Sequence, residues 1–126
     1  MKFKEEVMGK LIRFVIAHEV GHHAQYELGI IQSAGQSREA SIAVELQADC
    51  FAGLWVNSIR DLNVIQQGEI AEAIDAAAAV GDDRIQESVT GQVNPETWTH
   101  GSSEQRMFWF NRGYDSGAFE QCDTFE

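Results

Sequence analysis

Apolar residues recur at helical spacing over most of this chain and predict a mainly α fold. The first such segment runs from about Val7 to Leu28, and Gly29 marks its end. Its apolar positions predict a mostly buried helix; they are Leu11, Ile12, Val15, Ile16 and Val20. Residues 30–36 form the connection that follows.

Two further helices are expected in the middle of the chain. Ser37 suits an N-cap, with Glu39 in the first turn, for a helix that reaches about residue 62. A third helix is expected from about Gln67 to Val80, and Gly81 fits its C-terminal stop.

The last third of the chain predicts shorter elements. Residues 82–84 open a short helix, and Val89 to Val93 is the one segment that could form a strand. The segment Ser102-Ser103-Glu104-Gln105 matches a capping box, so a helix should begin there and run towards Gly113. Without repeats or an internal linker, we expect one domain over residues 1–126, with a minor strand at most.

The charge of the chain excludes some classes of partner. The 126 residues include 20 acidic and 9 basic side chains, so the formal net charge is −11. Nucleic acids and anionic membrane surfaces bind clustered Lys and Arg, and we expect neither as a partner. No apolar run approaches the ~18 residues of a membrane span, and the first residues, MKFKEE, lack the apolar stretch of a signal peptide. We therefore expect a soluble chain without a membrane segment.

Two histidines one helical turn apart are the main sign of chemistry. The segment His18-Glu19-Val20-Gly21-His22 is an H-E-x-x-H motif, which on a helix puts both imidazoles on one face with a carboxylate beside them. Catalytic zinc usually takes three protein ligands and keeps a fourth position for water; His18, His22 and Glu45 would supply them. The alternative is a polar helix face that carries this pattern by chance, although unpaired His and Glu are costly among apolar neighbours.

Glu45 and Asp49 form a second element of the predicted site. They lie four residues apart and share one helix face, which leaves room to pack against Gly21 because its other residues are Ala48, Ala52 and Gly53. A zinc-bound His usually donates its other ring N–H to a carboxylate, and Asp49 is the candidate partner of His18. Taken alone, the pair could be ordinary acids of an acidic chain. After the H-E-x-x-H motif, we interpret it as part of one zinc site.

These segments resemble a known family. The resemblance rests on the strings HEVGHH, ELQADCFAGLW, THGSSEQRMFWFNRGYDSG and QCDTF, which are similar to the neutral zinc metallopeptidases of the bacterial YpfJ type over about Val15 to Phe125. The Glu-x-x-x-Asp element also resembles the gluzincins, the wider group of thermolysin-like enzymes. This resemblance implies Zn2+ as the cofactor, Glu45 as its third ligand and Asp49 as the support of His18.

The resemblance also implies a fold and a location. It predicts a compact zincin-like helical core, with the upstream sheet of related peptidases short or missing because only residues 1–14 precede the metal helix. Family members are usually exported, which implies an extracytoplasmic protein, periplasmic or secreted. We expect no targeting signal in this chain, and a cytoplasmic location is the alternative. Export would suit a disulfide between Cys50 and Cys122, whereas two buried thiols would suit the cytosol.

The expected reaction is hydrolysis of peptide bonds in a peptide or protein substrate. Glu19 lies beside the ligands without being one, and it would take the proton of a zinc-activated water. Gluzincins commonly use a His, sometimes with a Tyr, to stabilise the oxyanion. The resemblance therefore makes His100 the candidate for this role, and Tyr114 and Tyr26 lesser candidates. The alternative is that His100 is a loop histidine that makes only a local hydrogen bond.

Other features and other functions are also consistent with the sequence. The aromatic run Phe108-Trp109-Phe110 is typical of a core, and Trp55 fits the packing of the helix that begins after Ser37. His23 lies about 100° around the helix from its neighbour in the motif and is left out of the site. Two alternatives to the enzyme are a zinc-binding domain without catalysis and a structural helical domain whose motif is accidental.

Overall fold

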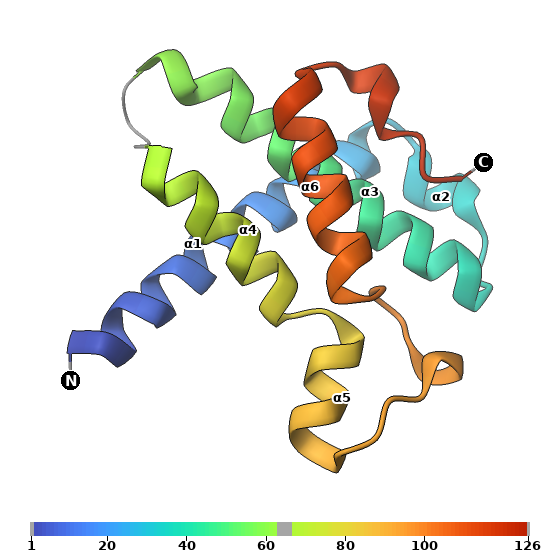
Figure 1. Ribbon diagram of the computed structural model, residues 1–126. Coiled ribbons are helices and arrows are strands. Elements are labelled where there is room, and N and C mark those ends of the chain that lie inside the picture. Colours follow the sequence, from blue (N-terminus) through green and yellow to red (C-terminus); the bar gives the residue numbers. More distant parts are fainter. Residues whose placement is uncertain (1, 63–66, 126) are drawn as a thin grey trace.

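The computed structural model describes residues 2–62 and 67–125, and every regular element in these two ranges is a helix (Figure 1). The α-helices are α1 (Lys2–Glu27), α2 (Ile30–Ala34), α3 (Arg38–Ile59), α4 (Gln67–Ala79), α5 (Asp82–Thr90) and α6 (Ser103–Ser116). The 3-10 turns are η1 (Arg60–Leu62), η2 (Pro95–Thr97) and η3 (Phe119–Cys122). The predicted mainly α fold is confirmed. No helix of the described ranges is long and apolar enough to cross a membrane.

Helices α3 and α6 begin at the capping residues that the sequence predicts. The side chain of Ser37 accepts a hydrogen bond from the N–H of Ala40 and caps α3. Ser102 and Gln105 form the capping box of α6, with both reciprocal hydrogen bonds present. Helix α3 carries Glu45 and Asp49, and α6 carries Arg106, so these caps fix where the helices that bear these residues begin.

Two expected elements are wrong. The strand expected over Val89–Val93 does not form, because its first two residues complete α5 and Gly91 ends that helix in a left-handed conformation with φ 76°. Residues 30–36, expected as a plain connection, contain the short helix α2. In both places a local helical turn satisfies the backbone hydrogen bonds.

Helix α3 is the centre of the packing. It packs against both α1 and α6, and α6 crosses it in Figure 1. Helix α4 packs in turn against α1 and α6. The apolar core between these four helices consists of Phe14, Ala17, Ala52, Val56, Ala76 and Phe110.

Glycines allow the closest approaches between these helices. A Cβ at Gly21 would lie 2.6 Å from the carbonyl oxygen of Ala48, so the predicted packing of these two segments is confirmed. Gly53, expected on the same face, packs instead against the backbone of α6. Gly113, expected to end α6, lies inside that helix and meets the backbone of α3. The helix ends later, at Gly117, whose φ is 58°.

The burial expected for the apolar positions of α1 is wrong. Val15, Ile16 and Val20 have exposed fractions of 44%, 53% and 41%, and the side chains of Leu11 and Ile12 lie outside the described part of the structure. The buried face of the helix carries instead Phe14, Ala17, His18, Gly21 and Gln25. Because α3 and α4 pack against one side of α1, the two histidines of the motif occupy the inner face, whereas these apolar residues lie on the outer one.

The aromatic run on α6 is core at one position only. Phe110 is fully buried and Trp109 is half-buried, whereas Phe108 is 53% exposed. Trp55, expected to pack on α3, is 37% exposed. Consecutive residues of a helix point about 100° apart, so only one row of α6 faces inward, formed by Ser103, Arg106, Phe110 and Gly113.

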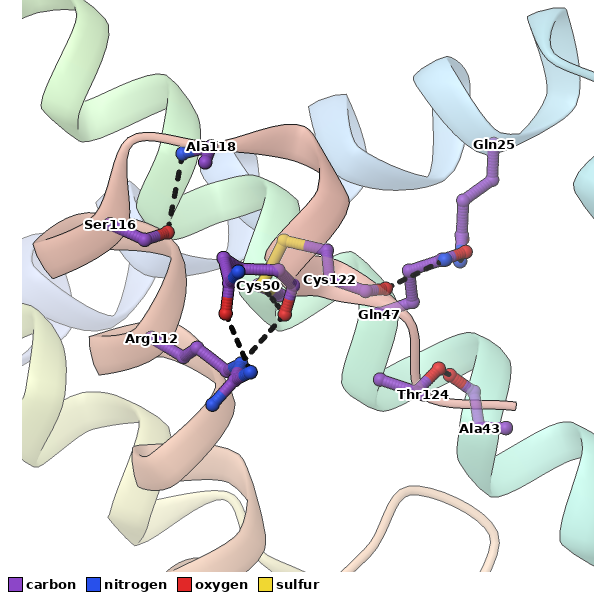
Figure 2. The surroundings of a disulfide bond; sticks show 10 residues. Gln25, Ala43, Gln47, Cys50, Arg112, Ser116, Ala118, Cys122 and Thr124 are labelled. Carbon is purple, nitrogen blue, oxygen red and sulfur yellow. Dashed lines mark hydrogen bonds between the residues drawn. A yellow bond between two sulfur atoms is a disulfide. The ribbon is translucent and has the colours of Figure 1, made fainter. Parts of the chain in front are cut away.

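A disulfide ties the C-terminal tail to α3. Cys50 and Cys122 are bonded and buried, so the predicted pairing is confirmed (Figure 2). The hydroxyl of Thr124 donates to the carbonyl of Ala43 and extends this attachment towards the start of α3. The tail therefore lies along the helix that also carries Glu45.

Candidate metal centre

His18 and His22 project from the covered side of α1 and meet Glu45 of α3. The Nε2 atoms of both imidazoles lie 2.8 Å from the same carboxylate oxygen, Oε2 of Glu45. The two rings stand edge to face, with their centroids 4.5 Å apart. The structure thus brings together the three residues that the sequence pattern grouped as one ligand set.

The second nitrogen of His18 contacts a buried carboxylate. Its Nδ1 lies 2.7 Å from Oδ1 of Asp49, whose side chain is fully buried, so the predicted contact is present. An ionised carboxylate only accepts hydrogen bonds, so Nδ1 carries the proton that His18 donates. In a neutral ring, Nε2 then presents a lone pair to Glu45.

The second nitrogen of His22 contacts a buried amide. Its Nδ1 lies 2.8 Å from Oε1 of Gln25, whose Nε2 donates to the carbonyl of Val44 and to Oε1 of Gln47. These two bonds use the amide nitrogen of Gln25, so its oxygen faces the imidazole and accepts the Nδ1 proton. His22 therefore also presents a lone pair at Nε2 when it is neutral.

Three electron-pair donors converge where His18, His22 and Glu45 meet, and positive charge is needed between them. Burial would lower the pKa of His18, but hydrogen bonds with Asp49 and Glu45 raise it to about 9. The hydrogen bond with Glu45 also raises the pKa of His22, against the effect of burial. Burial would raise the pKa of Glu45, but hydrogen bonds from both imidazoles hold it well below its usual range. A divalent cation can replace these protons, because imidazole nitrogens and carboxylate oxygens are zinc ligands.

Glu19 shares a pocket of about 190 Å³ with these residues. Its carboxylate and the imidazoles of His18 and His22 offer ligand atoms within 4.8 Å of one another, so these three residues could hold a metal ion. Glu45 makes the shorter contacts with the imidazoles, because it touches both Nε2 atoms and is half-buried, whereas Glu19 is exposed. Other walls of the pocket are formed by Phe14, Val15, Val80, His100 and Arg106.

His100 reaches this pocket from the loop before α6. Its Nε2 lies 3.5 Å from the other carboxylate oxygen of Glu45, and its side chain is 47% exposed. Asp82 holds the loop in place: its Oδ2 accepts from the backbone N–H groups of Thr99, His100 and Gly101 at 2.9, 2.7 and 3.0 Å. The side chain is thus held beside the cluster and remains open to solvent.

The lesser candidates lie away from the pocket. Tyr26 is 59% exposed, Tyr114 packs against the apolar core, and neither of these described residues lines the pocket. His23, left out of the predicted site, lies on the exposed side of α1 with its Nε2 3.9 Å from Oε1 of Glu27. Among these residues and His100, only His100 reaches the site.

Two buried residues behind the imidazoles were not predicted from the sequence. Gln25 supports His22, and Arg106 donates to the carboxylate of Asp49 from Nε and Nη2 at 2.8 and 3.0 Å. A signal for Arg106 exists in its spacing, because Phe110 follows four residues later on the buried face of α6. The burial of both residues depends on packing between helices, which the sequence pattern does not report.

Comparison with known proteins identifies the family of this chain. The sequence model of a family described as "Putative neutral zinc metallopeptidase" matches residues 7–125. The chain is 48% identical over 121 residues to the uncharacterized protein YpfJ of Escherichia coli strain K12, with 89% of this chain and 42% of the relative covered. It is 45% identical over 126 residues to an uncharacterized protein of Mycobacterium tuberculosis strain H37Rv, covering 89% of this chain and 43% of the relative. The chain thus spans less than half the length of these relatives, and no solved structure matches it.

Proposed function

Because the chain belongs to the family described as "Putative neutral zinc metallopeptidase", we propose that it is a zinc-dependent peptidase of the gluzincin type. The observation that carries this proposal is the convergence of His18 Nε2, His22 Nε2 and the Glu45 carboxylate on one point. Three such ligands leave the fourth position of a tetrahedral zinc to water. Zinc, when bound, would lower the pKa of that water towards about 7 and polarise the scissile carbonyl.

We assign the third ligand to Glu45 and the proton transfer to Glu19. Glu45 already lies at hydrogen-bond distance from both nitrogens, and its negative charge is stabilised there. Glu19 is exposed and lines the same pocket, so its carboxylate is open to a water molecule and a substrate. It would accept a proton from the attacking water and deliver it to the leaving amine.

His100 is the group that we propose at the oxyanion. It lines the pocket, and the hydrogen bonds from its loop to Asp82 hold it in place. Its Nε2 could donate to the carbonyl oxygen as negative charge develops there. His100→Ala should therefore lower kcat with little change in KM, because the contact forms only in the transition state. A rise in KM at constant kcat would assign His100 to substrate binding instead.

The substitution Glu19→Gln tests the peptidase directly. The variant should keep one zinc per chain and the parental helical content, and it should lose nearly all chelator-sensitive hydrolysis of casein. Glu27→Gln is the matched control, because Glu27 lies on the same helix and is exposed. It should hydrolyse casein at the parental rate. Hydrolysis that survives in Glu19→Gln, or in the parent after zinc removal, would contradict the mechanism.

A zinc-binding domain without catalysis is the second candidate function. It is favoured by the lack of any strand within residues 2–62 and 67–125, so this part of the chain offers no sheet edge to bind a substrate backbone. A zinc-loaded parent chain that cleaves no member of a diverse peptide library would select this function. Chelator-sensitive cleavage, abolished in Glu19→Gln, would select the enzyme.

We also propose an extracytoplasmic location. The disulfide between Cys50 and Cys122 supports it, because oxidising compartments form and preserve such bonds. Mass spectrometry of protein recovered from its native host, alkylated before digestion without reductant, should find the linked peptide. Two alkylated thiols in that protein would contradict the location.

A further inference from the structure

Arg106 is a buried cation at the meeting point of four helices. It belongs to α6 and has an exposed fraction of 4%. Its Nε and Nη2 donate to Oδ2 and Oδ1 of Asp49 in α3, and its Nη1 donates at 3.0 Å to the carbonyl of Val80, which follows α4. The guanidinium carbon lies 5.5 Å from the ring centre of Phe14 in α1. Each polar contact of the side chain is thus made inside the protein.

Asp49 explains why a cation lies here. Its side chain has no exposed surface, and an ionised carboxylate in that position is costly unless it is paired and hydrogen-bonded. Arg106 compensates the charge and also restrains the geometry. The two N–H groups of a guanidinium edge meet both oxygens of a carboxylate in one plane, so the pair has a single preferred orientation.

That orientation determines how Asp49 meets His18. Oδ1 of Asp49 accepts from Nδ1 of His18 at 2.7 Å and from Nη2 of Arg106 at 3.0 Å, and those two nitrogens are 3.4 Å apart. If the carboxylate rotated, its hydrogen bond to Nδ1 would be lost and the imidazole could turn its Nε2 away from Glu45. Outer hydrogen bonds of this kind set the tautomer and direction of a metal-binding imidazole.

We propose that Arg106, which lines the pocket but is almost fully buried, is a positioning residue of the metal centre and orients His18 through Asp49. The inference rests on the proposed function only in that His18 binds zinc. It follows that Arg106 affects zinc affinity through Asp49. The positive charge alone is insufficient, because a lysine ammonium lacks the planar pair of donors.

Zinc affinity of the full chain, measured by competition with a chelator, tests the proposal. Arg106→Lys keeps the charge and removes the paired donors, and it should weaken zinc binding about 10-fold or more, within the range for lost outer partners of a metal ligand. Arg112→Lys is the matched control, because Arg112 also lies on α6 and donates from Nε and Nη2, to Gln121, but is exposed. It should change the affinity by less than about twofold, as is usual for surface substitutions.

A double-variant cycle separates positioning from a general contribution to the fold. Asp49→Asn should weaken zinc binding, and adding Arg106→Lys should then cause less than about twofold further loss, since residues that act through one route are not additive. Additive losses, or parental zinc affinity in Arg106→Lys, would overturn the proposal. The proposal would also be overturned if Arg106→Lys and the double variant both lost their helical circular dichroism signal in the presence of chelator, because Arg106 would then serve the fold. A parent that binds no zinc would overturn this proposal and the zinc peptidase together, whereas zinc binding without hydrolysis would overturn the peptidase alone.

Discussion

The two imidazoles of the candidate centre are supported by different chemistry. Behind His18 stands an ion pair, in which Asp49 accepts the Nδ1 proton and Arg106 compensates the carboxylate. Behind His22 stands the neutral amide of Gln25. Both supports are buried, so they differ in charge rather than in access to water. Their energetic consequences should therefore differ as well.

The charged support is vulnerable to the loss of either member. Removing one partner of a buried ion pair leaves an uncompensated charge in a medium of low polarity. Arg106 also donates to Val80, so the pair links the end of α4 to α3 and α6. We therefore expect stability and zinc affinity to fall together when Asp49 is removed.

The neutral support leads to the disulfide. Gln25 donates to Gln47, and Gln47 donates at 2.8 Å to the carbonyl of Cys122 (Figure 2). An amide both donates and accepts, so this chain of bonds passes from the imidazole to the C-terminal tail without any charge. The disulfide to Cys50 fixes the last acceptor. The position of His22 is thus connected to the tail, although the loss of one link leaves no buried charge.

The largest expected effect on zinc binding follows from removal of a ligand and is independent of which support lies behind the imidazole. His22→Ala should abolish stoichiometric zinc, because two remaining ligands do not hold a catalytic zinc tightly. It should also remove the stabilisation by zinc, which is about 2.7 kcal/mol at a free concentration 100-fold above the Kd. Metal analysis after dialysis and calorimetry with and without zinc measure both quantities. One zinc per chain in this variant would show that the metal lies elsewhere.

Next in size is the loss of the charged support. Asp49→Ala leaves Arg106 without its partner and should cost about 3–5 kcal/mol of unfolding free energy, measured by urea denaturation in the presence of chelator. Its zinc affinity should also fall about 10–100-fold. A loss of stability as small as that of a surface substitution would show that Arg106 finds another partner or water.

Removing the disulfide should have an intermediate effect. The bond joins residues 72 apart in sequence, and replacing Cys50 and Cys122 by Ser should cost about 2–4 kcal/mol of unfolding free energy. Urea denaturation in chelator measures this loss. Zinc affinity should fall less than in Asp49→Ala, because Gln25 still accepts from His22 when the tail is released. A larger loss of zinc affinity than in Asp49→Ala would reverse the ranking of the two supports.

The smallest effect is expected for the neutral support. Gln25→Ala removes the acceptor of the Nδ1 proton and should cost about 1–3 kcal/mol, the range for a buried group left without a hydrogen bond. Gln32→Ala is the control, since Gln32 is exposed. It should stay within about 0.5 kcal/mol of the parent. If Gln25→Ala lowered the free energy of unfolding as much as Asp49→Ala in the same urea assay, the charge of the support would not determine how much each support stabilises the protein.

Several parts of the site could be predicted because they depend on spacing within one helix. His18 and His22 share a face at any rotation of α1, and the same holds for Glu45 and Asp49 on α3. The capping residues Ser37 and those of α6 also act within one turn of backbone, and the structure has them as expected.

Other predictions failed because they depend on what surrounds a helix. Val15, Ile16 and Val20 are as apolar as core residues, yet they are exposed, because the neighbouring helices cover the face of α1 that carries Phe14, His18 and Gln25. Phe108 is exposed because the packing of α6 on α3 decides which residues of α6 face inward, and Phe108 is not one of them. Apolar character alone does not tell which side of a helix a neighbour covers.

The amino-acid sequence by itself determined the helical character of the chain, the pairing of two imidazoles on one helix and the carboxylates that face them on another. Only the tertiary structure decided that Arg106 and Gln25 stand behind those imidazoles, and that the Cys122 carbonyl ends one of the two chains of bonds. Spacing along a helix is a local property of the backbone. A hydrogen bond between residues far apart in sequence exists only after packing has excluded water and fixed the distance.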